Sequence, residues 1–555
     1  MDFVEALDIR IEEIASACTQ CGKCFEACPM TGPAGIRDTE PTAVLSGIVD
    51  ILRGNAGNVE AEAWASACSS SGNCIEACDY GVNPRTMVRL AHFAMTRRRD
   101  GEAVKSNAMK SYRAMAKAVR IVSRLQLDAD RLNTLQPPAG RSKPERPPDI
   151  VIYTGCNIHK TPHILILCLD VISAMGLTYE LVGGPSACCG VFQFLSGDAE
   201  TSGRAGLSTL KQIDSIGAGE TISWCPSCQT QFDDVIIPSH KQMTGDDAFA
   251  LTPFFLFLER HIDRLKDLFV FPVNKRVALN ERPGYPAVIR AVKRILQAIP
   301  GLEFVELDVQ RAGLMSNYLT VTPKFKDALR EREFKAAADA GVTTLATIFH
   351  ACHRELCHFE RDVTFEIVNV MELIGESMGI KADDIYKRLK MMNEVEAMMD
   401  DCGEMIRRHG LDPDEARDVL LADQLAARPP QGRIVEPYSA SRPSGAKRLP
   451  KINFISPGRA HREVQAAAGS SVMIAARAND VAGIEAECAG SLSCGTCHVY
   501  VTPEFVARLP TASEQEEEML GFVAAERRAG SRLACQIVLT DELDGLTLEI
   551  PKTQS

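Results

Sequence analysis

A Cys-Cys-Gly motif at residues 188–190 constrains the fold of this chain more than any other feature of its sequence. Thirty-one residues separate its cysteine pair from Cys156, and thirty-five separate the pair from Cys225-Pro-Ser-Cys228. Each of these three cysteine groups follows a hydrophobic run, DIVIYTG, TYELVGG or TISW. Such runs, alternating with helical patterns, predict parallel strands whose carboxyl ends meet at one edge of a sheet. We therefore expect five thiols to converge at that edge.

Five convergent thiols suit an inorganic cluster better than a single metal ion. Adjacent cysteines on an extended backbone point in different directions, and one tetrahedral zinc takes only four ligands. A zinc site or buried structural thiols are the alternatives, because Cys-x2-Cys alone is a common zinc pair. Gly190 allows a positive φ or a close approach of the backbone to the cofactor. The candidate ligands are Cys156, Cys188, Cys189, Cys225 and Cys228.

This cysteine spacing resembles the CCG domain in the B subunit of heterodisulfide reductase. Iron-sulfur subunits of glycolate and glycerol-3-phosphate dehydrogenases, and the E subunit of some archaeal succinate dehydrogenases, belong to the same family. The resemblance implies that the five cysteines hold a noncubane [4Fe-4S] cluster.

A second, degenerate copy of the strand-helix pattern follows within residues 150–390. A shift of 124 residues aligns the five cysteines with Asn280, Ala312, Gly313, Phe349 and Cys352. Alanine, glycine and phenylalanine side chains cannot bind iron, so we expect no cluster in this second half. His350, Cys352, His353, Cys357 and His358 cluster in the sequence here. Because no distant acidic partner stands out, we interpret them as helix and loop residues rather than as a metal site.

The first hundred residues contain two further cysteine runs. The run from Cys18 to Pro29 has the Cys-x2-Cys-x2-Cys-x3-Cys-Pro spacing of bacterial ferredoxins. The second run has Ser71 where the middle cysteine would stand. In two-cluster ferredoxins the fourth cysteine of each run binds the other cluster. We therefore assign one [4Fe-4S] cluster to Cys18, Cys21, Cys24 and Cys78, and a second cluster, one corner of which lacks a thiolate, to Cys28, Cys68 and Cys74.

The second run resembles the iron-sulfur subunit of succinate dehydrogenase and fumarate reductase, whose three-cysteine site holds [3Fe-4S]. The wider module also resembles the C subunit of heterodisulfide reductase. The first resemblance implies [3Fe-4S] at the three-cysteine site; the alternative is a [4Fe-4S] cluster completed by the Ser71 hydroxyl or by water. Asp79 departs from both families, which usually have proline there.

The C-terminal region contains Cys488-x5-Cys494-x2-Cys497-x37-Cys535 after alternating strand patterns. The five-residue first gap resembles adrenodoxin-type ferredoxins rather than plant-type ones. That resemblance implies a β-grasp fold with [2Fe-2S], and Gly490 and Gly495 suit a loop whose N–H groups point at the cluster sulfurs. It also implies that an acidic helix docks basic partners. A solvated helix is the alternative for this segment, which contains Thr511, Ser513, Glu514, Glu516, Glu517 and Glu518.

Proline-rich stretches and changes of pattern divide the chain into modules. The expected fold class is multidomain α/β and α+β: a helical two-cluster ferredoxin module, a duplicated Rossmann-like CCG domain and a β-grasp ferredoxin. The expected boundaries are 1–133 for the helical module, 134–149 for a linker, 150–390 for the duplicated domain, 391–450 for a helical segment and second linker, and 451–555 for the [2Fe-2S] ferredoxin.

The net charge and the spacing of the cysteines exclude some classes of function and favour others. A net charge of −12 argues against nucleic-acid binding, which needs a basic surface. Sixteen of the twenty cysteines stand in metal-ligand spacings, which indicates a reducing cytoplasm. No leader pattern and no apolar run long enough for a membrane span is visible, so membrane docking would be peripheral and through a partner.

These features favour an electron-transfer subunit of a larger oxidoreductase, because clusters pass electrons singly and no flavin or nicotinamide motif stands out. We expect it to relay electrons between a flavoprotein dehydrogenase and a quinone or ferredoxin-like acceptor. The alternative is a heterodisulfide reductase-like thiol–disulfide reductase, in which Cys188 and Cys189 would be catalytic.

Overall fold

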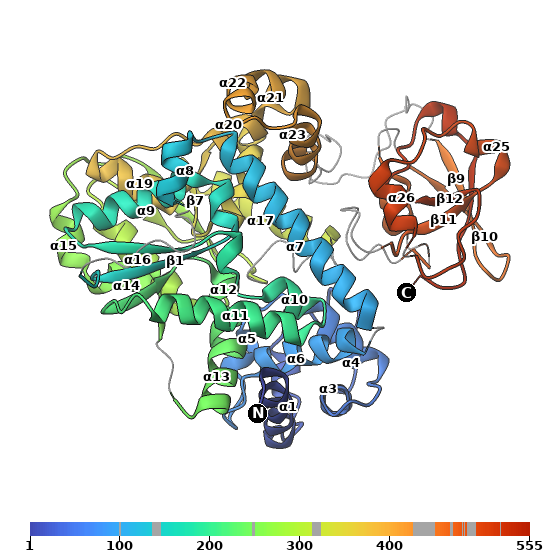
Figure 1. Ribbon diagram of the computed structural model, residues 1–555, viewed down its shortest axis with the longest axis horizontal. Helices are drawn as coiled ribbons and strands as arrows, with labels where there is room; N and C mark the ends of the chain where they lie inside the picture. Colours follow the sequence, from blue (N-terminus) through green and yellow to red (C-terminus); the bar gives the residue numbers. More distant parts are fainter. Residues whose placement is uncertain are drawn as a thin grey trace. The chain divides into compact units, whose positions relative to one another are not determined.

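The computed structural model describes residues 1–98, 101–135, 146–246, 250–312, 323–425, 450–466, 470–479, 481, 483–484, 495–521 and 523–554. The chain forms two compact units, Met1–Ala427 and Arg428–Ser555 (Figure 1). Within the described ranges, every helix is too short or too polar to cross a bilayer.

The first unit begins with helices whose ends are set by capping residues. Asp2 and Glu5 form a reciprocal capping box at the start of α1, and Asn83 caps α6, which has Pro84 in its first turn. Two short helices, α2 and α5, each start after a left-handed glycine. The N-terminal helices are α1 Phe3–Ala17, α2 Lys23–Glu26, α3 Pro41–Leu52, α4 Val59–Ala67, α5 Asn73–Glu76, α6 Pro84–Arg97, α7 Gly101–Arg124 and α8 Ala129–Leu135.

A four-stranded parallel sheet in the order β2-β1-β3-β4 forms the first half of the CCG region. Its central strand β1 is buried throughout, as expected for a strand covered on both faces. The elements are β1 Ile150–Gly155, η1 Asn157–Lys160, α9 Pro162–Ala174, β2 Tyr179–Gly183, η2 Pro185–Ala187, α10 Val191–Leu195, α11 Ala199–Asp214, β3 Glu220–Ser223, α12 Pro226–Gln231, η3 Phe232–Ile236, α13 Ile237–Thr244, β4 Leu251–Pro253, α14 Phe254–Arg260 and α15 Ile262–Asp267.

The second half repeats this topology in a parallel sheet of order β6-β5-β7-β8. Helices of the two halves pack together, α9 on α19 and α14 on α16, around one hydrophobic core. The predicted duplicated α/β architecture is therefore confirmed. The elements are β5 Arg276–Asn280, α16 Pro286–Ala298, β6 Glu303–Val305, α17 Pro323–Asp339, β7 Thr344–Thr347, α18 His350–Leu356, η5 Cys357–Arg361, β8 Glu366–Asn369 and α19 Val370–Met378.

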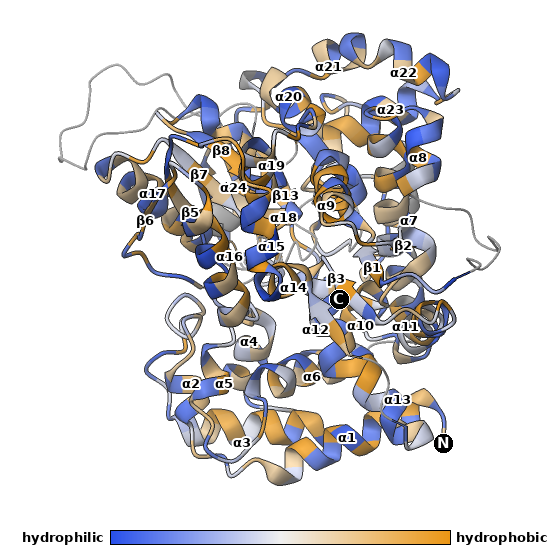
Figure 2. Ribbon diagram, turned by 90° about the vertical axis from the view of Figure 1, so that its left-hand side faces the viewer, coloured by the Kyte–Doolittle hydropathy of each residue, from blue (hydrophilic) through white to orange (hydrophobic). Residues whose placement is uncertain are grey.

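The N-terminal helices pack onto the first half of the CCG region rather than forming a separate unit. One buried cluster joins side chains of α1, α3, α4 and α6 to those of β1, α10 and η3. Phe93 of α6 stacks on Phe194 of α10, with ring centroids 4.6 Å apart. Figure 2 shows α1, α3 and α6 lying along one side of this region.

A small helical group completes the first unit and packs on α7. Its core contains Ile121, Val122 and Leu125 of α7 together with Tyr386 and Leu389. As a result, α7 runs from this group to α10 in one continuous helix (Figure 1). The group comprises α20 Ile385–Met392, α21 Val395–Asp401, α22 Gly403–Arg408, α23 Pro413–Leu420 and η6 Leu421–Leu425.

The second unit contains a five-stranded mixed sheet in the order β10-β9-β13-β11-β12. β13 and β9 are parallel, whereas the other pairs are antiparallel. The mixed sheet agrees with the predicted ferredoxin fold. The elements are β9 Lys451–Ile455, β10 His461–Gln465, α24 Val472–Ala478, β11 His498–Val501, α25 Pro503–Val506, α26 Glu514–Leu520, β12 Ser531–Leu533, η7 Asp541–Leu543 and β13 Leu546–Glu549.

Candidate iron-sulfur centres

The five CCG cysteines lie at the carboxyl edge of the first parallel sheet. Cys156 directly follows β1, and Cys225 directly precedes α12, two residues after β3. The Cys-Cys-Gly motif follows η2, the turn that continues β2. All five side chains are buried, with relative exposures of 8% or less: Cys156, Cys188, Cys189, Cys225 and Cys228.

The same five thiols crowd together closely enough to govern one another's ionisation. Cys189 contacts both Cys188 and Cys228, and Cys228 contacts Cys225. Burial, together with Cys189 and Cys225, raises the pKa of Cys156 to about 12. Several buried thiolates cannot coexist without a compensating cation. The donor set therefore fits an iron-sulfur cluster, which would supply that charge.

Two glycines make room for this gathering of sulfur atoms. Gly190 has a φ of +81°, and a Cβ there would lie 2.4 Å from the Ser202 carbonyl oxygen. Gly155 has a φ of +70°, and its Cβ would lie 3.1 Å from Cys228 Sγ. Gly190 was predicted from the sequence, whereas Gly155 was not. The position of Gly155, between a hydrophobic run and Cys156, could have indicated it.

Helix α7 covers the CCG site. Tyr112 donates a hydrogen bond of 2.6 Å to the Pro185 carbonyl oxygen, next to the Cys-Cys-Gly turn. Met115 and Val119, on the same helix, pack against Cys156. Tyr112, Met115 and Val119 lie in the predicted helical module, 1–133, and no motif there indicated a role at the CCG site.

The N-terminal module brings its first four assigned cysteines together. Burial raises the pKa of Cys24 to about 12, and Cys18, Cys21 and Cys78 add to the increase. Cys21 is exposed at the surface, whereas Cys24 is buried. Cys78 comes from the second run but lies beside the first three cysteines of the first run. The thiols therefore have the crossed arrangement expected of a two-cluster ferredoxin.

The remaining three cysteines form a second group. Burial raises the pKa of Cys68 to about 11; Cys28 adds to the increase, and the guanidinium groups of Arg89 and Arg85 oppose it. Burial followed by Cys68 and Cys28 raises the pKa of Cys74. Trp64 Nε1 donates to Cys28 Sγ over 3.2 Å, a type of contact that tunes cluster potential.

Ser71 stands in the backbone position that corresponds to Cys21. Gln20 and Ser70 share an unusual left-handed conformation, with φ values of 57° and 55°, and each precedes one of these two residues. The glycines that follow, Gly22 and Gly72, are left-handed as well. Ser71 is 6% exposed, and a Cβ at Gly72 would lie 3.2 Å from the Gly284 Cα of the second CCG half. The CCG region therefore covers the Ser71 side of the three-cysteine site, where a fourth thiolate would otherwise stand.

The second CCG half has charged side chains where the first half has sulfur. Asn280, which aligns with Cys156, donates a 2.6 Å hydrogen bond to the buried Glu333, and Arg311 pairs with the same carboxylate at 2.6 Å. The single aligned thiol, Cys352, accepts a hydrogen bond from Arg282. An open pocket of about 70 Å³ is lined by Asn280, Arg282, Arg311 and Glu333 among others. The absence of a cluster from this half stays a prediction, and Gly313 lies outside the described residues.

In the second unit, Cys497 is buried at the start of β11 and Cys535 is partly buried. Gln536 Nε2 donates to Cys535 Sγ over 3.3 Å. Gly495 is left-handed, with a φ of 71°. Cys488, Cys494 and Gly490 lie outside the described residues, so their role as ligands and loop residues stays a prediction.

The expected acidic docking helix needs a correction at Glu516. Ser513 caps α26, as the sequence indicated, by accepting from the Glu516 N–H. The Glu516 carboxylate, however, is only 2% exposed, pairs with Arg532 at 2.8 Å and accepts from the Leu533 N–H. Its charge is neutralised inside the unit and is not available to a partner. Glu517 is exposed but pairs with Arg527.

Two polar groups were not predicted from the sequence, and one of them corrects the interpretation of His353 as a residue without a distant acidic partner. Arg85 and Arg89 of α6 both pair with the buried Asp234 of η3, at 3.2 and 2.9 Å. His163 and His353 meet Glu372 and Asp384 between the two CCG halves. The i, i+4 spacing of Arg85 and Arg89 places them on one helix face. Spacing alone, however, identifies neither Asp234 nor the carboxylates that His163 and His353 meet.

Comparison with known proteins assigns each of the three modules. Residues 14–82 match the family model of the 4Fe-4S dicluster domain, residues 150–233 that of the cysteine-rich CCG domain, and residues 456–540 that of the 2Fe-2S iron-sulfur cluster binding domain. The dicluster and ferredoxin modules are thus 4Fe-4S and 2Fe-2S domains, and the CCG module implies a further cluster.

Similar individual proteins match the C-terminal module. Ferredoxin CarAc of a Sphingomonas species is 54% identical over 105 residues, 19% of this chain and 95% of that protein. Putidaredoxin of Pseudomonas putida is 43% identical over 106 residues, 19% of this chain and 99% of that protein. The crystal structure of a ferredoxin from Rhodopseudomonas palustris HaA2, 44% identical, covers 19% of this chain and 100% of its own, with a TM-score of 0.19. Through its C-terminal domain the chain belongs to the putidaredoxin-type 2Fe-2S ferredoxin family, and it joins that domain to a 4Fe-4S dicluster domain and a CCG domain.

Proposed function

We propose that this chain is the iron-sulfur electron-transfer subunit of a larger oxidoreductase, relaying electrons between a flavoprotein dehydrogenase and a quinone or ferredoxin-like acceptor. The proposal rests on three kinds of iron-sulfur domain in one chain. When bound, the clusters accept and donate electrons one at a time. The protein's contribution is to hold them close, shield them from water and adjust their potentials.

One observation carries the proposal: the three-cysteine site of the dicluster domain adjoins the CCG site through a continuous set of contacts. Arg85 lies near Cys68 and is 5.9 Å from the Tyr285 ring centroid. The Tyr285 hydroxyl donates to the Pro226 carbonyl oxygen over 2.8 Å, between the last two CCG cysteines. A relay needs such proximity between centres, whereas independent modules on a flexible tether do not provide it.

The burial of the CCG site also supports a relay. All five cysteines are at least 92% buried, and α7 lies over Cys156 with its Tyr112 hydroxyl bonded to Pro185. An electron can leave a buried cluster without direct contact with its acceptor. A disulfide substrate, in contrast, must touch the centre that reduces it.

The finer cofactor assignments belong to this proposal. We assign a noncubane [4Fe-4S] cluster to the five CCG cysteines and [3Fe-4S] to Cys28, Cys68 and Cys74. Ser71 supports the second assignment, because it keeps the backbone conformation of Cys21 but lacks its thiol. Cys18, Cys21, Cys24 and Cys78 would hold [4Fe-4S], and Cys488, Cys494, Cys497 and Cys535 would hold [2Fe-2S].

The test is to reduce the purified chain anaerobically and mix it with a quinone analogue, an oxidised ferredoxin or a small disulfide. We expect the first two to reoxidise the clusters and the disulfide to leave them reduced. Cys189→Ala should slow reoxidation of the dicluster centres, since it removes the neighbouring acceptor. Multiple turnovers of the disulfide, lost in Cys189→Ala, would overturn the proposal.

That outcome would favour the second candidate, a thiol–disulfide reductase acting at Cys188 and Cys189. A narrow cleft of about 10 Å³ lies beside Cys225 between the two CCG halves, and its lining includes Trp224, Phe254, Phe255, Tyr285 and Phe349. The cleft has room for no more than about one water molecule, so this candidate requires it to open before a substrate reaches Cys225.

A further inference from the structure

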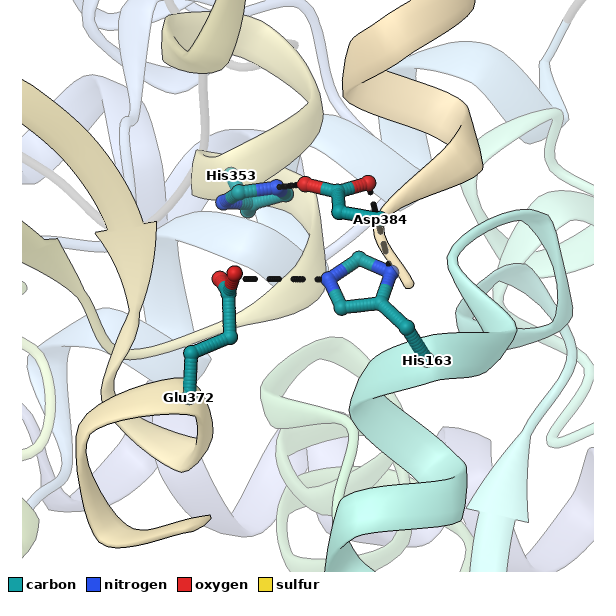
Figure 3. A group of neighbouring side chains, drawn as sticks. All are labelled: His163, His353, Glu372 and Asp384. Carbon is teal, nitrogen blue, oxygen red and sulfur yellow. Dashed lines mark hydrogen bonds and ion pairs between the residues drawn. The ribbon is translucent and has the colours of Figure 1, made fainter. Parts of the chain in front are cut away.

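Two histidines and two carboxylates meet at the junction of the CCG halves, away from every cysteine set assigned above. His163 comes from α9 of the first half, and His353 from α18 of the second. Glu372 lies in the first turn of α19, and Asp384 is the N-cap residue of α20. Figure 3 shows the four side chains converging on a common centre. One nitrogen or oxygen atom of each lies within 4.8 Å of those of the others.

The two histidines are buried, but their hydrogen bonding is incomplete. The side chains of His163 and His353 are 1% and 0% exposed, and those of Asp384 and Glu372 are 9% and 23% exposed. His353 Nε2 lies 2.6 Å from Asp384 Oδ2. Neither ring nitrogen of His163 makes a hydrogen bond, although Nδ1 is 3.3 Å from Asp384 Oδ1 and Nε2 is 3.9 Å from Glu372 Oε2. Buried polar atoms without a partner are costly, so an imidazole in this state indicates an absent ligand.

Backbone N–H groups hold the two carboxylates in place and leave oxygen lone pairs that can bind a metal ion at the centre. Glu372 Oε2 accepts the Asn369 N–H over 2.6 Å, and Asp384 Oδ1 accepts the Lys387 N–H over 2.9 Å. Each carboxylate has further lone pairs. The outer partners therefore orient these oxygens as metal-site supports do.

The pairings among the four side chains leave a position for a ligand at their centre. Asp384 pairs with His353, but the two nitrogens of His163, 3.3 Å from Asp384 and 3.9 Å from Glu372, make no hydrogen bond. Imidazole nitrogens in such a position can bind a metal ion. The nearby ammonium of Lys387 already pairs with Glu360, and Cys357 is the other titratable group facing this region. A histidine–aspartate ion pair alone would satisfy His353 Nε2 but would leave His353 Nδ1 and both nitrogens of His163 without a hydrogen bond.

We propose that His163, His353, Glu372 and Asp384 bind one divalent transition-metal ion, for which Zn²⁺ is the best fit. Zn²⁺ binds histidine nitrogens and carboxylate oxygens, and four protein ligands would leave no open coordination position, as in structural zinc sites. Ligand atoms of a tetrahedral zinc lie roughly 3.3 Å apart, so small side-chain rotations would complete the site. The ion would join α9 of the first half to α18, α19 and the start of α20. This role is structural and does not depend on the electron-transfer function.

The experiment measures zinc and iron in the full-length chain, produced with added Zn²⁺ and dialysed against a weak chelator. We expect about one zinc per chain with unchanged iron. Zinc-edge X-ray absorption should show nitrogen and oxygen ligands at about 2.0–2.1 Å and no sulfur ligands at about 2.3 Å. Sulfur in the coordination shell would place the zinc at a vacant cysteine site and overturn the proposal.

Variants separate this site from adventitious binding. His163→Gln and Asp384→Asn should each lose most of the zinc while retaining their iron. The matched controls are His350→Gln, a buried histidine on the same helix as His353, and Asp383→Asn, the exposed neighbour of Asp384; both should keep the zinc. If a site variant fails to fold, Glu372→Gln preserves shape and provides the same comparison. Zinc that persists in the site variants, or wild-type chain that retains none, would refute the assignment.

Discussion

Arg282 Nε donates a hydrogen bond to Cys352 Sγ over 2.9 Å, so a half-buried guanidinium holds the only thiol that the second CCG half shares in register with the first. In the first half the aligned residue, Cys228, lies among four other thiols. The two halves share one sheet topology but hold their corresponding cysteines with different chemistry. In the second half Arg311 and Glu333 form an ion pair, and Arg282 bonds to the thiol.

We predict that Cys352→Ala leaves the iron content and all cluster signals unchanged. It should lower the free energy of unfolding by about 1 kcal/mol, since the half-buried Arg282 loses one hydrogen-bond acceptor. Cys228→Ala is the matched comparison and should remove the CCG cluster signal. Iron analysis, spin-resonance spectra and thermal unfolding of both variants measure these effects. Loss of iron in Cys352→Ala alone would show that the second half binds metal through this thiol.

A second prediction concerns the cluster inventory and the corner at Ser71. The proposed assignments require roughly 13 iron atoms per fully loaded chain. Ser71→Cys should raise this by about one and remove an oxidised-state [3Fe-4S] signal, because the backbone there already matches that around Cys21.

Ser71→Ala is the control for the serine variant. It should retain the [3Fe-4S] signal if the hydroxyl is not a ligand. A wild-type chain with no such signal and with about 14 irons would instead indicate a complete [4Fe-4S] cluster.

The features that depend on local spacing, namely the cysteine groups and the parallel strands, could be predicted from the sequence. Cysteine runs and hydrophobic runs indicated which thiols would lie together and that the strands would be parallel, because ligand spacing and strand ends are local properties. The 124-residue shift also indicated the second sheet, whose β7 begins 124 residues after β3.

The rest depended on how the elements pack. Asp384 follows His163 by 221 residues, and no motif links them. Asp234 meets Arg85 and Arg89 only because the N-terminal helices dock on the CCG region. Glu516 belongs to an acidic helix by sequence, yet Arg532 on a neighbouring strand takes its charge. Pairings of this kind follow from tertiary packing, which periodicity does not reveal.

A third prediction concerns acid stability through His159. Burial lowers the pKa of His159 to about 4, below the value of about 6.5 in an unfolded chain. A histidine with a lowered folded-state pKa contributes stability fully above pH 6.5, and this contribution falls as the pH decreases toward 4. Lowering the pH from 7.5 to 5.5 should therefore cost about 1 kcal/mol through this residue.

His159→Gln tests the pH effect, because glutamine does not titrate and can still bond to Thr154, the partner of His159 at 3.2 Å. The variant should have a shallower loss of stability between these pH values, measured by denaturant unfolding under anaerobic conditions. An unchanged pH dependence would mean that folding does not lower the pKa of His159.

The last prediction concerns the junction between the dicluster domain and the CCG region. Asp234 is 4% exposed at its side chain and neutralises both Arg85 and Arg89, which are 8% and 5% exposed. Asp234→Ala would leave two buried guanidinium groups without an anion, which typically destabilises by about 3–5 kcal/mol. Because Arg85 lies between the three-cysteine site and Tyr285, the variant should also slow electron exchange between the dicluster and CCG centres.

Asp8→Ala is the control for this junction. Asp8 pairs with Arg97 on the same helix as Arg85, but both side chains are 38% or more exposed. Screening by solvent limits such a pair to about 1 kcal/mol or less, and electron exchange should be unchanged. Thermal unfolding and rapid-mixing reduction of both variants make the comparison. If Asp234→Ala is as stable as Asp8→Ala and its centres equilibrate at the wild-type rate, the buried ion pair is not the connection between the two cysteine sites, and the contact path proposed for the relay is wrong.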